Sequence, residues 1–282
     1  MIQDSSSVKR AAFYVEKGGV GKTTSAAHVG VSAHQNHDLD VLLIDLAGTQ
    51  NDLATQFGMP EEVDDPDAPI SAVFGDSWEF IKENVDDLLD QIAFSTDEGP
   101  DLIPADRGLT GADNNLANVP AEDRFTKLDA FIGNFVAPQY DLVLFDLPGK
   151  EDNIALNGLF AAGNIVAPLP PGAFERQQLD NLRESLAAIR DTHSVDVRVV
   201  IVTPTMVDQT TNISDRFLDE LETEFEGMVS TPVANTANIR NEQAEGQTVY
   251  AVPPDELYET GRRTREAYTE LTTDLLDRLE AR

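Results

Sequence analysis

The feature that most constrains this chain is a glycine-rich segment, "KGGVGKTT", at residues 17–24. It follows a short apolar run at residues 11–17 and precedes a segment with the periodicity of an amphipathic helix, residues 23–34. Glycines allow backbone N–H groups to turn toward phosphate oxygens, and the N-terminus of a helix adds partial positive charge. A strand, three glycines, a lysine and two threonines in this order predict a phosphate-binding loop.

The residues of this loop have separable expected roles. Lys22 is expected to bridge the β- and γ-phosphates of a nucleotide, and the Thr23 hydroxyl group to bind Mg²⁺. A phosphate loop does not in general require a second cation before its first glycine, so Lys17 needs another explanation. The residues expected to contact phosphate in the same subunit are Gly18, Gly19, Val20, Gly21, Lys22, Thr23 and Thr24.

Two aspartates end predicted strands elsewhere in the chain. Asp146 ends "DLVLFD", and Asp45 ends "VLLID". Ligands of open α/β sheets bind at the carboxyl ends of the strands, so both aspartates are expected at the phosphate loop. We expect Asp146 to hold Mg²⁺ together with Thr23, and Asp45 to support the site. Either aspartate alone could be a solvated or helix-capping residue.

The rest of the chain alternates apolar runs with helical patterns, as in a doubly wound, mainly parallel α/β sheet with helices on both faces. Residues 1–282 are expected to form one domain, with a flexible tail at residues 1–8 and an embellishment at residues 60–100. The predicted strands cover residues 40–47, 99–106, 140–149, 164–171 and 195–205. Helices are expected at residues 77–92 and 174–191, and a last helix from Pro254 or Asp255 is expected to pack on the sheet.

The composition limits the environment. The chain has 51 acidic and 20 basic residues, a net charge of −31, and no cysteine. The lack of cysteine excludes disulfides, iron–sulfur clusters, thiolate zinc sites and a cysteine nucleophile. The charge is typical of a cytoplasmic protein adapted to molar salt, although an ordinary acidic protein is the alternative. No signal-like segment or run of about 18 apolar residues is visible, so we expect no membrane partner.

Several motifs in series resemble the ParA/MinD (Soj-like) family of deviant Walker A P-loop ATPases. They are "KGGVGKTT", "VLLIDL", "DLIPADRGLTGADNNL", "YDLVLFDLPG", "VAPLPPGAFERQQLDNL", "VTPTMVDQTTNIS" and "NTANIRNEQAEGQTV". The resemblance implies a homodimer with Mg·ATP between its subunits, which partitions or positions DNA or a protein complex and responds to a ParB-like activator. It also implies that Lys17 reaches the ATP of the partner subunit, and that Lys17, Lys22 and Asp45 serve catalysis.

The segment after the second strand departs from the family. Relatives of this kind read D-x-D-P-Q, whereas this chain reads "DLAGTQ", with Ala47 in place of the second aspartate. Alanine cannot orient an attacking water. Candidate substitutes are Gln50, Asn51, Asp52 and Asp152. We therefore expect slow or partner-dependent hydrolysis; the alternatives are a non-hydrolysing ATP-bound scaffold and, on the same fold, a small-molecule ligase or kinase of the dethiobiotin synthetase type.

Contacts with DNA follow from the resemblance alone. An arginine common in the family is replaced by Thr210, while Arg240 is retained, and Arg262 and Arg263 begin the last helix. A solvated helix face explains the last two equally well, and the strong negative charge opposes DNA binding. The resemblance also places Pro253 and Pro254 beside an adenine, although a helix start explains them as well. The pair His34 and His37 lacks further metal ligands.

Overall fold

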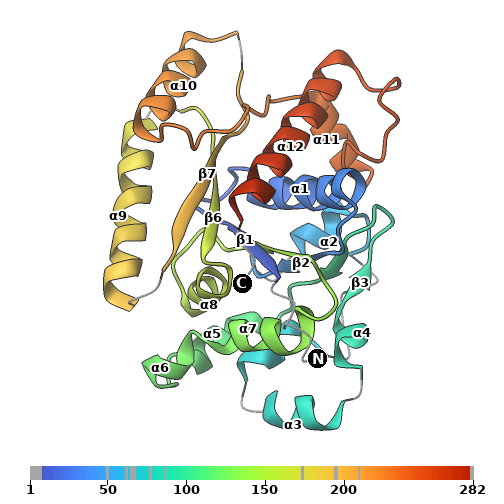
Figure 1. Cartoon of the computed structure of the whole chain (residues 1–282), viewed down its shortest axis with the longest axis vertical. Helices are drawn as coiled ribbons and strands as arrows, with labels where there is room; N and C mark the ends of the chain where they lie inside the picture. Colours follow the sequence, from blue (N-terminus) through green and yellow to red (C-terminus); the bar gives the residue numbers. More distant parts are fainter. Residues whose placement is uncertain are drawn as a thin grey trace, which may run out of the picture.

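Seven strands form one sheet in the order β3-β4-β2-β5-β1-β6-β7 (Figure 1). All neighbouring pairs are parallel except β3 and β4, which are antiparallel. The structure, a computed structural model, describes residues 8–48, 51–60, 63, 68–75, 78–85, 87–172, 175–193, 196–208 and 210–279. Most of the expected tail at residues 1–8, and Gln50, lie outside them. The strands are β1 (Lys9–Phe13), β2 (Val41–Asp45), β3 (Phe94–Ser95), β4 (Asp101–Ile103), β5 (Leu142–Asp146), β6 (Asn164–Leu169) and β7 (Arg198–Pro204).

Alternating strand residues face two separate apolar cores. In β2, Leu42 and Ile44 face one core, while Val41 and Leu43 face the other. Because both faces are covered, the central strands are apolar throughout, which is typical of parallel sheets. The expected doubly wound, mainly parallel α/β fold is therefore confirmed.

Helices cover both faces of the sheet (Figure 1). On one face lie α1, α2, α11 and α12, and the other core includes α5, α7, α8 and α9. The helices are α1 (Lys22–His37), α2 (Asp52–Gln56), α3 (Trp78–Asn84), α4 (Leu88–Ile92), α5 (Leu109–Leu116), α6 (Ala121–Arg124), α7 (Lys127–Phe131), α8 (Asn153–Ala162), α9 (Glu175–His193), α10 (Asn212–Glu224), α11 (Ala237–Ala244) and α12 (Glu259–Arg278), with a 3₁₀ helix at Ile70–Phe74 and a π-helix at Ile132–Val136.

Two helix predictions were wrong in their bounds. The helix expected at residues 77–92 is two helices, α3 and α4, because Asp87 adopts the left-handed conformation with φ 51° and becomes the N-cap of α4. The last helix begins at Glu259 rather than at residue 254 or 255. Pro253 accepts the turn hydrogen bond from the backbone N–H of Glu256 at 3.0 Å, so the prolines form a turn before the helix. The last helix packs along α1 and also contacts β7.

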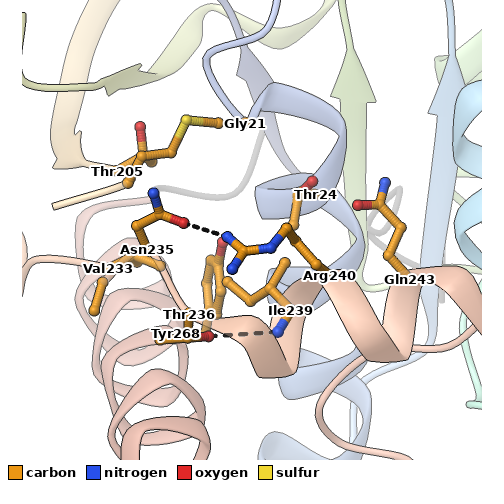
Figure 2. A pocket seen from close by; sticks show the side chains of 12 residues that line it. Gly21, Thr24, Thr205, Val233, Asn235, Thr236, Ile239, Arg240, Gln243 and Tyr268 are labelled. Carbon is orange, nitrogen blue, oxygen red and sulfur yellow. Dashed lines mark hydrogen bonds between the residues drawn. The ribbon is translucent and has the colours of Figure 1, made fainter. Parts of the chain in front are cut away.

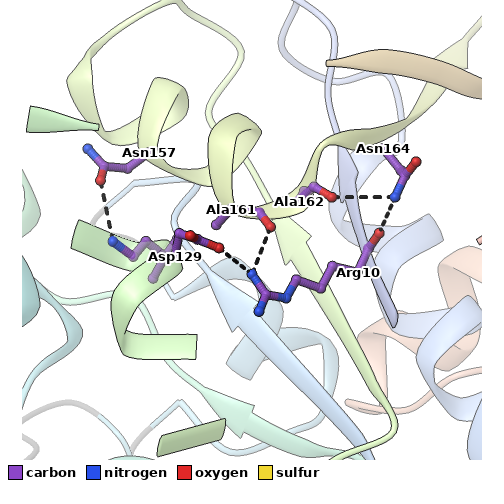
Figure 3. Close-up of polar contacts among 7 residues, drawn as sticks. Arg10, Asp129, Asn157, Ala161, Ala162 and Asn164 are labelled. Atoms are coloured by element: carbon purple, nitrogen blue, oxygen red, sulfur yellow. Dashed lines mark hydrogen bonds and ion pairs between the residues drawn. The ribbon is translucent and has the colours of Figure 1, made fainter. Parts of the chain in front are cut away.

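A buried arginine anchors the end of α8 opposite the phosphate loop (Figure 3). Arg10, on β1, is only 6% exposed, and its Nη1 donates to Asp129 Oδ1 at 2.5 Å and to the Ala161 carbonyl at 3.2 Å. In the middle of α8, Asn157 Oδ1 accepts from the backbone N–H of Leu128 at 3.4 Å. A buried charge requires such partners, so β1, α7 and α8 are tied together at this edge. No helix in the described part of the chain is both long and apolar enough to cross a bilayer.

Candidate nucleotide-binding site

The glycine-rich segment forms an open loop between β1 and α1. Gly19 and Gly21 have φ values of 69° and 89°, in the left-handed region where a side chain would be strained. Gly21 is the N-cap of α1, so the first backbone N–H groups of the helix border the loop. Space around Gly18 and Gly19 is open within 4 Å. The loop thus presents unobstructed backbone at a helix N-terminus, which is a favourable site for phosphate.

The two lysines of the loop have different environments. Lys22 is 8% exposed, and its Nζ donates to the Lys17 carbonyl oxygen at 2.7 Å. Burial lowers the pKa of Lys22, and the nearby charge of Asp146 opposes that shift. The backbone of Lys17 therefore closes the loop on Lys22, while Lys17 itself is exposed.

Thr23 and Asp146 meet at the carboxyl ends of the strands, as expected. The Thr23 hydroxyl donates to Asp146 Oδ2 at 2.5 Å. Asp146 is fully buried, and its Oδ1 has no hydrogen-bond partner among the described residues. Burial, followed by the charge of Asp45, raises the pKa of Asp146 well above its ordinary value. A buried carboxylate oxygen without a partner, beside a hydroxyl oxygen, fits a hard cation such as Mg²⁺.

Asp45 stands next to Asp146 in the register of β2 and β5. It is 1% exposed, and its two oxygens accept backbone hydrogen bonds from Ala47 at 2.9 Å and Leu53 at 3.2 Å. Burial raises the pKa of Asp45 to about 6, and these two hydrogen bonds oppose the shift. Asp45 therefore fixes the segment that follows β2, including Ala47, relative to the site.

Gly149 brings the loop after β5 against the phosphate loop. A Cβ atom at this position would lie 2.8 Å from both the carbonyl carbon and oxygen of Lys17, and 3.0 Å from the backbone nitrogen of Gly18. Only glycine allows this approach. The sequence placed Gly149 only at the end of the strand predicted at residues 140–149, and this backbone contact was not predicted.

A pocket of about 270 Å³ continues from the loop (Figure 2). Thr205, at the end of β7, links it to the loop by donating from Oγ1 to the Val20 carbonyl oxygen at 2.9 Å. Sequence reasoning missed this pocket, and Pro253 and Pro254 do not line it. The lining residues are Gly21, Thr24, Thr205, Met206, Val233, Ala234, Asn235, Thr236, Ile239, Arg240, Gln243 and Tyr268.

The wall behind the pocket rests on a buried histidine. His28 Nδ1 lies 2.7 Å from the Thr24 carbonyl oxygen, and the backbone N–H of Val249 donates to His28 Nε2 at 3.3 Å. These partners assign the proton to Nδ1. The ring stacks on Tyr268 with centroids 4.5 Å apart, and burial lowers the pKa of His28 to about 4.

The remaining predicted residues lie in several places. Arg240 lines the pocket. Arg262 donates to the Leu257 carbonyl at 2.6 Å, and Arg263 pairs with Glu259 at 2.5 Å. Both arginines therefore contact residues at the N-terminal end of α12. No cluster of three or more His, Cys, Asp or Glu residues suited to a metal occurs in the described ranges, which include His34 and His37.

The residues considered as substitutes for the aspartate missing at position 47 lie in different environments. Asn51 has a φ of 51°, and its buried Oδ1 has no hydrogen-bond partner among the described residues. Asp52 begins α2. Asp152 is the N-cap of α8, accepting from the backbone N–H of Ala155 at 2.8 Å, and it pairs with Lys150.

Comparisons with known proteins agree with this geometry. A family model described as an AAA domain matches residues 8–199, more than half of the chain. The sporulation initiation inhibitor protein Soj of Bacillus subtilis (strain 168) is 25% identical over 261 residues, covering 92% of this chain and 95% of that protein. The chromosome-partitioning ATPase Soj of Thermus thermophilus is 26% identical over 243 residues, covering 86% and 87%.

Solved structures share the fold. An ATP complex of McdA from Cyanothece superposes with a TM-score of 0.76 at 19% identity, covering 96% of this chain and 97% of that one. Cobyrinic acid a,c-diamide synthase from Mycobacterium smegmatis, with a bound ATP analog and magnesium, has a TM-score of 0.70 at 24% identity, covering 95% and 94%.

Proposed function

This chain belongs to the AAA domain family and is a homologue of the Soj proteins and of the chromosome partitioning protein ParA of Myxococcus xanthus, and we propose that it is a Mg·ATP-dependent dimerisation switch. The switch would partition or position DNA or a protein complex. The observation that carries the proposal is the meeting of Lys22, Thr23 and Asp146 at one sheet edge, with a pocket beyond Gly21 that can take a nucleoside.

The residues present fit Mg·ATP. Thr23 Oγ1 and Asp146 Oδ1 would supply oxygen ligands to Mg²⁺, and the backbone from Gly18 to Thr24 would surround the phosphates. Lys22 can exchange its contact with the Lys17 carbonyl for phosphate oxygens. Bound Mg²⁺ would neutralise charge on the phosphates.

Lys17 supports the dimeric form of the switch. Lys17 is exposed at the rim of the loop, while Lys22 is the lysine of the same loop that is expected to contact phosphate. A second cation at the rim can reach the triphosphate of a second copy, where exclusion of water strengthens the attraction. Loss of the γ-phosphate would remove that attraction and release the partner.

The mass of the protein in solution tests this proposal. Wild-type protein with Mg²⁺ and a non-hydrolysable ATP analogue should double its mass in light scattering, across a KCl series up to molar concentrations. Lys17→Ala should bind the analogue and remain monomeric. Lys82→Ala, which removes the same charge from α3, should dimerise as the wild type does. A wild-type protein that binds the analogue without a change in mass would refute the switch.

Ala47 favours slow or partner-dependent hydrolysis, and a non-hydrolysing scaffold is the second candidate function. Ala47 has no side-chain group to orient water, and its backbone N–H is bound to Asp45. ATP turnover alone, and with a ParB-like activator if one is found, separates the two. Steady release of phosphate supports the cycling switch, whereas intact ATP with a stable dimer supports the scaffold.

DNA binding remains a prediction from family resemblance for Arg240, Arg262 and Arg263. The net charge of −31 opposes it, because binding to DNA depends on phosphate neutralisation and weakens steeply with salt. A protein complex is therefore the cargo that the charge favours.

A further inference from the structure

Arg240 is an exposed residue of α11 whose side chain also borders the pocket beside the phosphate loop. It lines the pocket together with Gly21 and Thr24. Its Nη1 donates to Asn235 Oδ1 at 2.7 Å, and Figure 2 shows the guanidinium turned toward Asn235 across the pocket. An arginine expected to contact DNA is therefore engaged with a neighbouring pocket residue.

This contact fixes which end of the Asn235 amide faces Arg240. A guanidinium group has donors and no acceptor, so the amide atom that faces it must be the oxygen. The amide nitrogen of Asn235 then points away from Arg240, as Figure 2 shows. The NH₂ group of Asn235 is consequently not used by Arg240, and its two N–H donors can serve a ligand in the pocket.

The other pocket residues suit the faces of a flat ring. Met206, Val233, Ile239 and Tyr268 contribute apolar surface. Two hydroxyl groups are already used by the backbone, since Thr205 donates to the Val20 carbonyl and Thr236 accepts from the backbone N–H of Ile239 at 3.4 Å. A ring bound here needs polar partners from the pocket rim, where Asn235 and Gln243 lie.

We propose that Arg240 is a positioning residue for nucleobase recognition: it holds the Asn235 amide so that its NH₂ group donates to an acceptor nitrogen of the base. The inference rests on the proposed function, because the base is that of the ATP bound at the loop. Holding the amide in advance removes the cost of ordering it on binding. Arg240 thereby sets base affinity without touching the phosphates.

Comparing the affinities of two ligands, one with and one without a nucleoside, isolates the contribution of the nucleobase to binding. Binding of Mg·ATP and of Mg·tripolyphosphate to the full chain is measured by calorimetry, and the ratio of the two dissociation constants reports the contribution of the nucleoside. Asn235→Asp keeps the contact with Arg240 but replaces the donor with an acceptor. Arg240→Gln removes the guanidinium. Arg216→Gln removes the same charge from an exposed position of α10 and serves as the control.

We expect Asn235→Asp and Arg240→Gln to weaken Mg·ATP binding about 10-fold while tripolyphosphate binding is unchanged, as the loss of one hydrogen bond implies. Arg216→Gln should match the wild type for both ligands. Unchanged ATP affinity in Asn235→Asp or Arg240→Gln, or an equal loss for both ligands, would overturn the inference. A wild-type protein that binds neither ligand would instead refute the proposed function itself.

Discussion

Replacing Gly149 with alanine tests whether contact between two loops holds the phosphate site together. The added Cβ would lie 2.8 Å from the carbonyl carbon and oxygen of Lys17, whereas ordinary contacts begin at 3.4 Å. The two loops must therefore separate by about 0.6 Å or more. Both obstructing groups belong to the backbone, so no side-chain rotation can relieve the overlap.

The structure sets the size of the expected effect. Overpacking of this kind costs about 1–3 kcal/mol. If the phosphate loop carries the displacement, Mg·ATP binding weakens by about 5- to 150-fold. Gly111→Ala is a matched control, because Gly111 lies in α5 with open space around it. Alanine there should raise the unfolding free energy by up to about 1 kcal/mol and leave ATP binding unchanged.

Two measurements on each variant decide the matter: the dissociation constant of Mg·ATP by calorimetry, and the unfolding free energy by urea titration. Gly149→Ala should weaken ATP binding and Gly111→Ala should not. Wild-type ATP affinity in Gly149→Ala would refute the reasoning, because it would mean that the Lys17 backbone does not depend on the loop after β5.

Three further predictions concern turnover, metal and pH. Ala47→Asp should raise ATP turnover about 100-fold by supplying a group that orients water, and an unchanged rate of phosphate release would mean that another residue already does so. Asp146→Asn should weaken Mg²⁺ binding by at least about tenfold, seen as a shifted Mg²⁺ titration of ATP binding; an unshifted titration would exclude Asp146 as a ligand. His28 stays neutral in the fold down to about pH 4, whereas in the unfolded chain it gains a proton near pH 6.5, so its contribution to stability is lost as pH falls between these values. Urea titrations should show that this loss, up to about 3 kcal/mol, is absent in His28→Asn, and equal pH dependence in both proteins would contradict the assignment.

The sheet and the phosphate loop could be predicted because both depend on local sequence. Buried parallel strands are continuous apolar runs, which a reader can recognise without knowing their neighbours. The pairing of Thr23 with Asp146 followed from the rule that strand ends meet at one edge. Asp45 followed from the same rule, and the structure adds that its oxygens hold the segment after β2.

The pocket could not be predicted, because its lining comes from four distant parts of the chain: the start of α1, the end of β7, residues 233–243 and α12. Residues such as Met206 and Tyr268 carry no motif, and only tertiary packing brings them together. The prediction of one helix over residues 77–92 failed for a local reason. The left-handed Asp87 interrupts a segment whose apolar spacing is continuous.

The packing of α12 has a consequence for how the protein is made. Lys9 Nζ donates to the Leu276 carbonyl at 2.7 Å, which joins β1 to a helix 267 residues later in the chain. Tyr268, on the same helix, forms part of the pocket and stacks on His28. During synthesis from the N-terminus, the phosphate loop leaves the ribosome long before these partners exist. The pocket proposed to hold the nucleoside is therefore complete only after α12 has been synthesised, and a product truncated before α12 lacks the Tyr268 part of its lining.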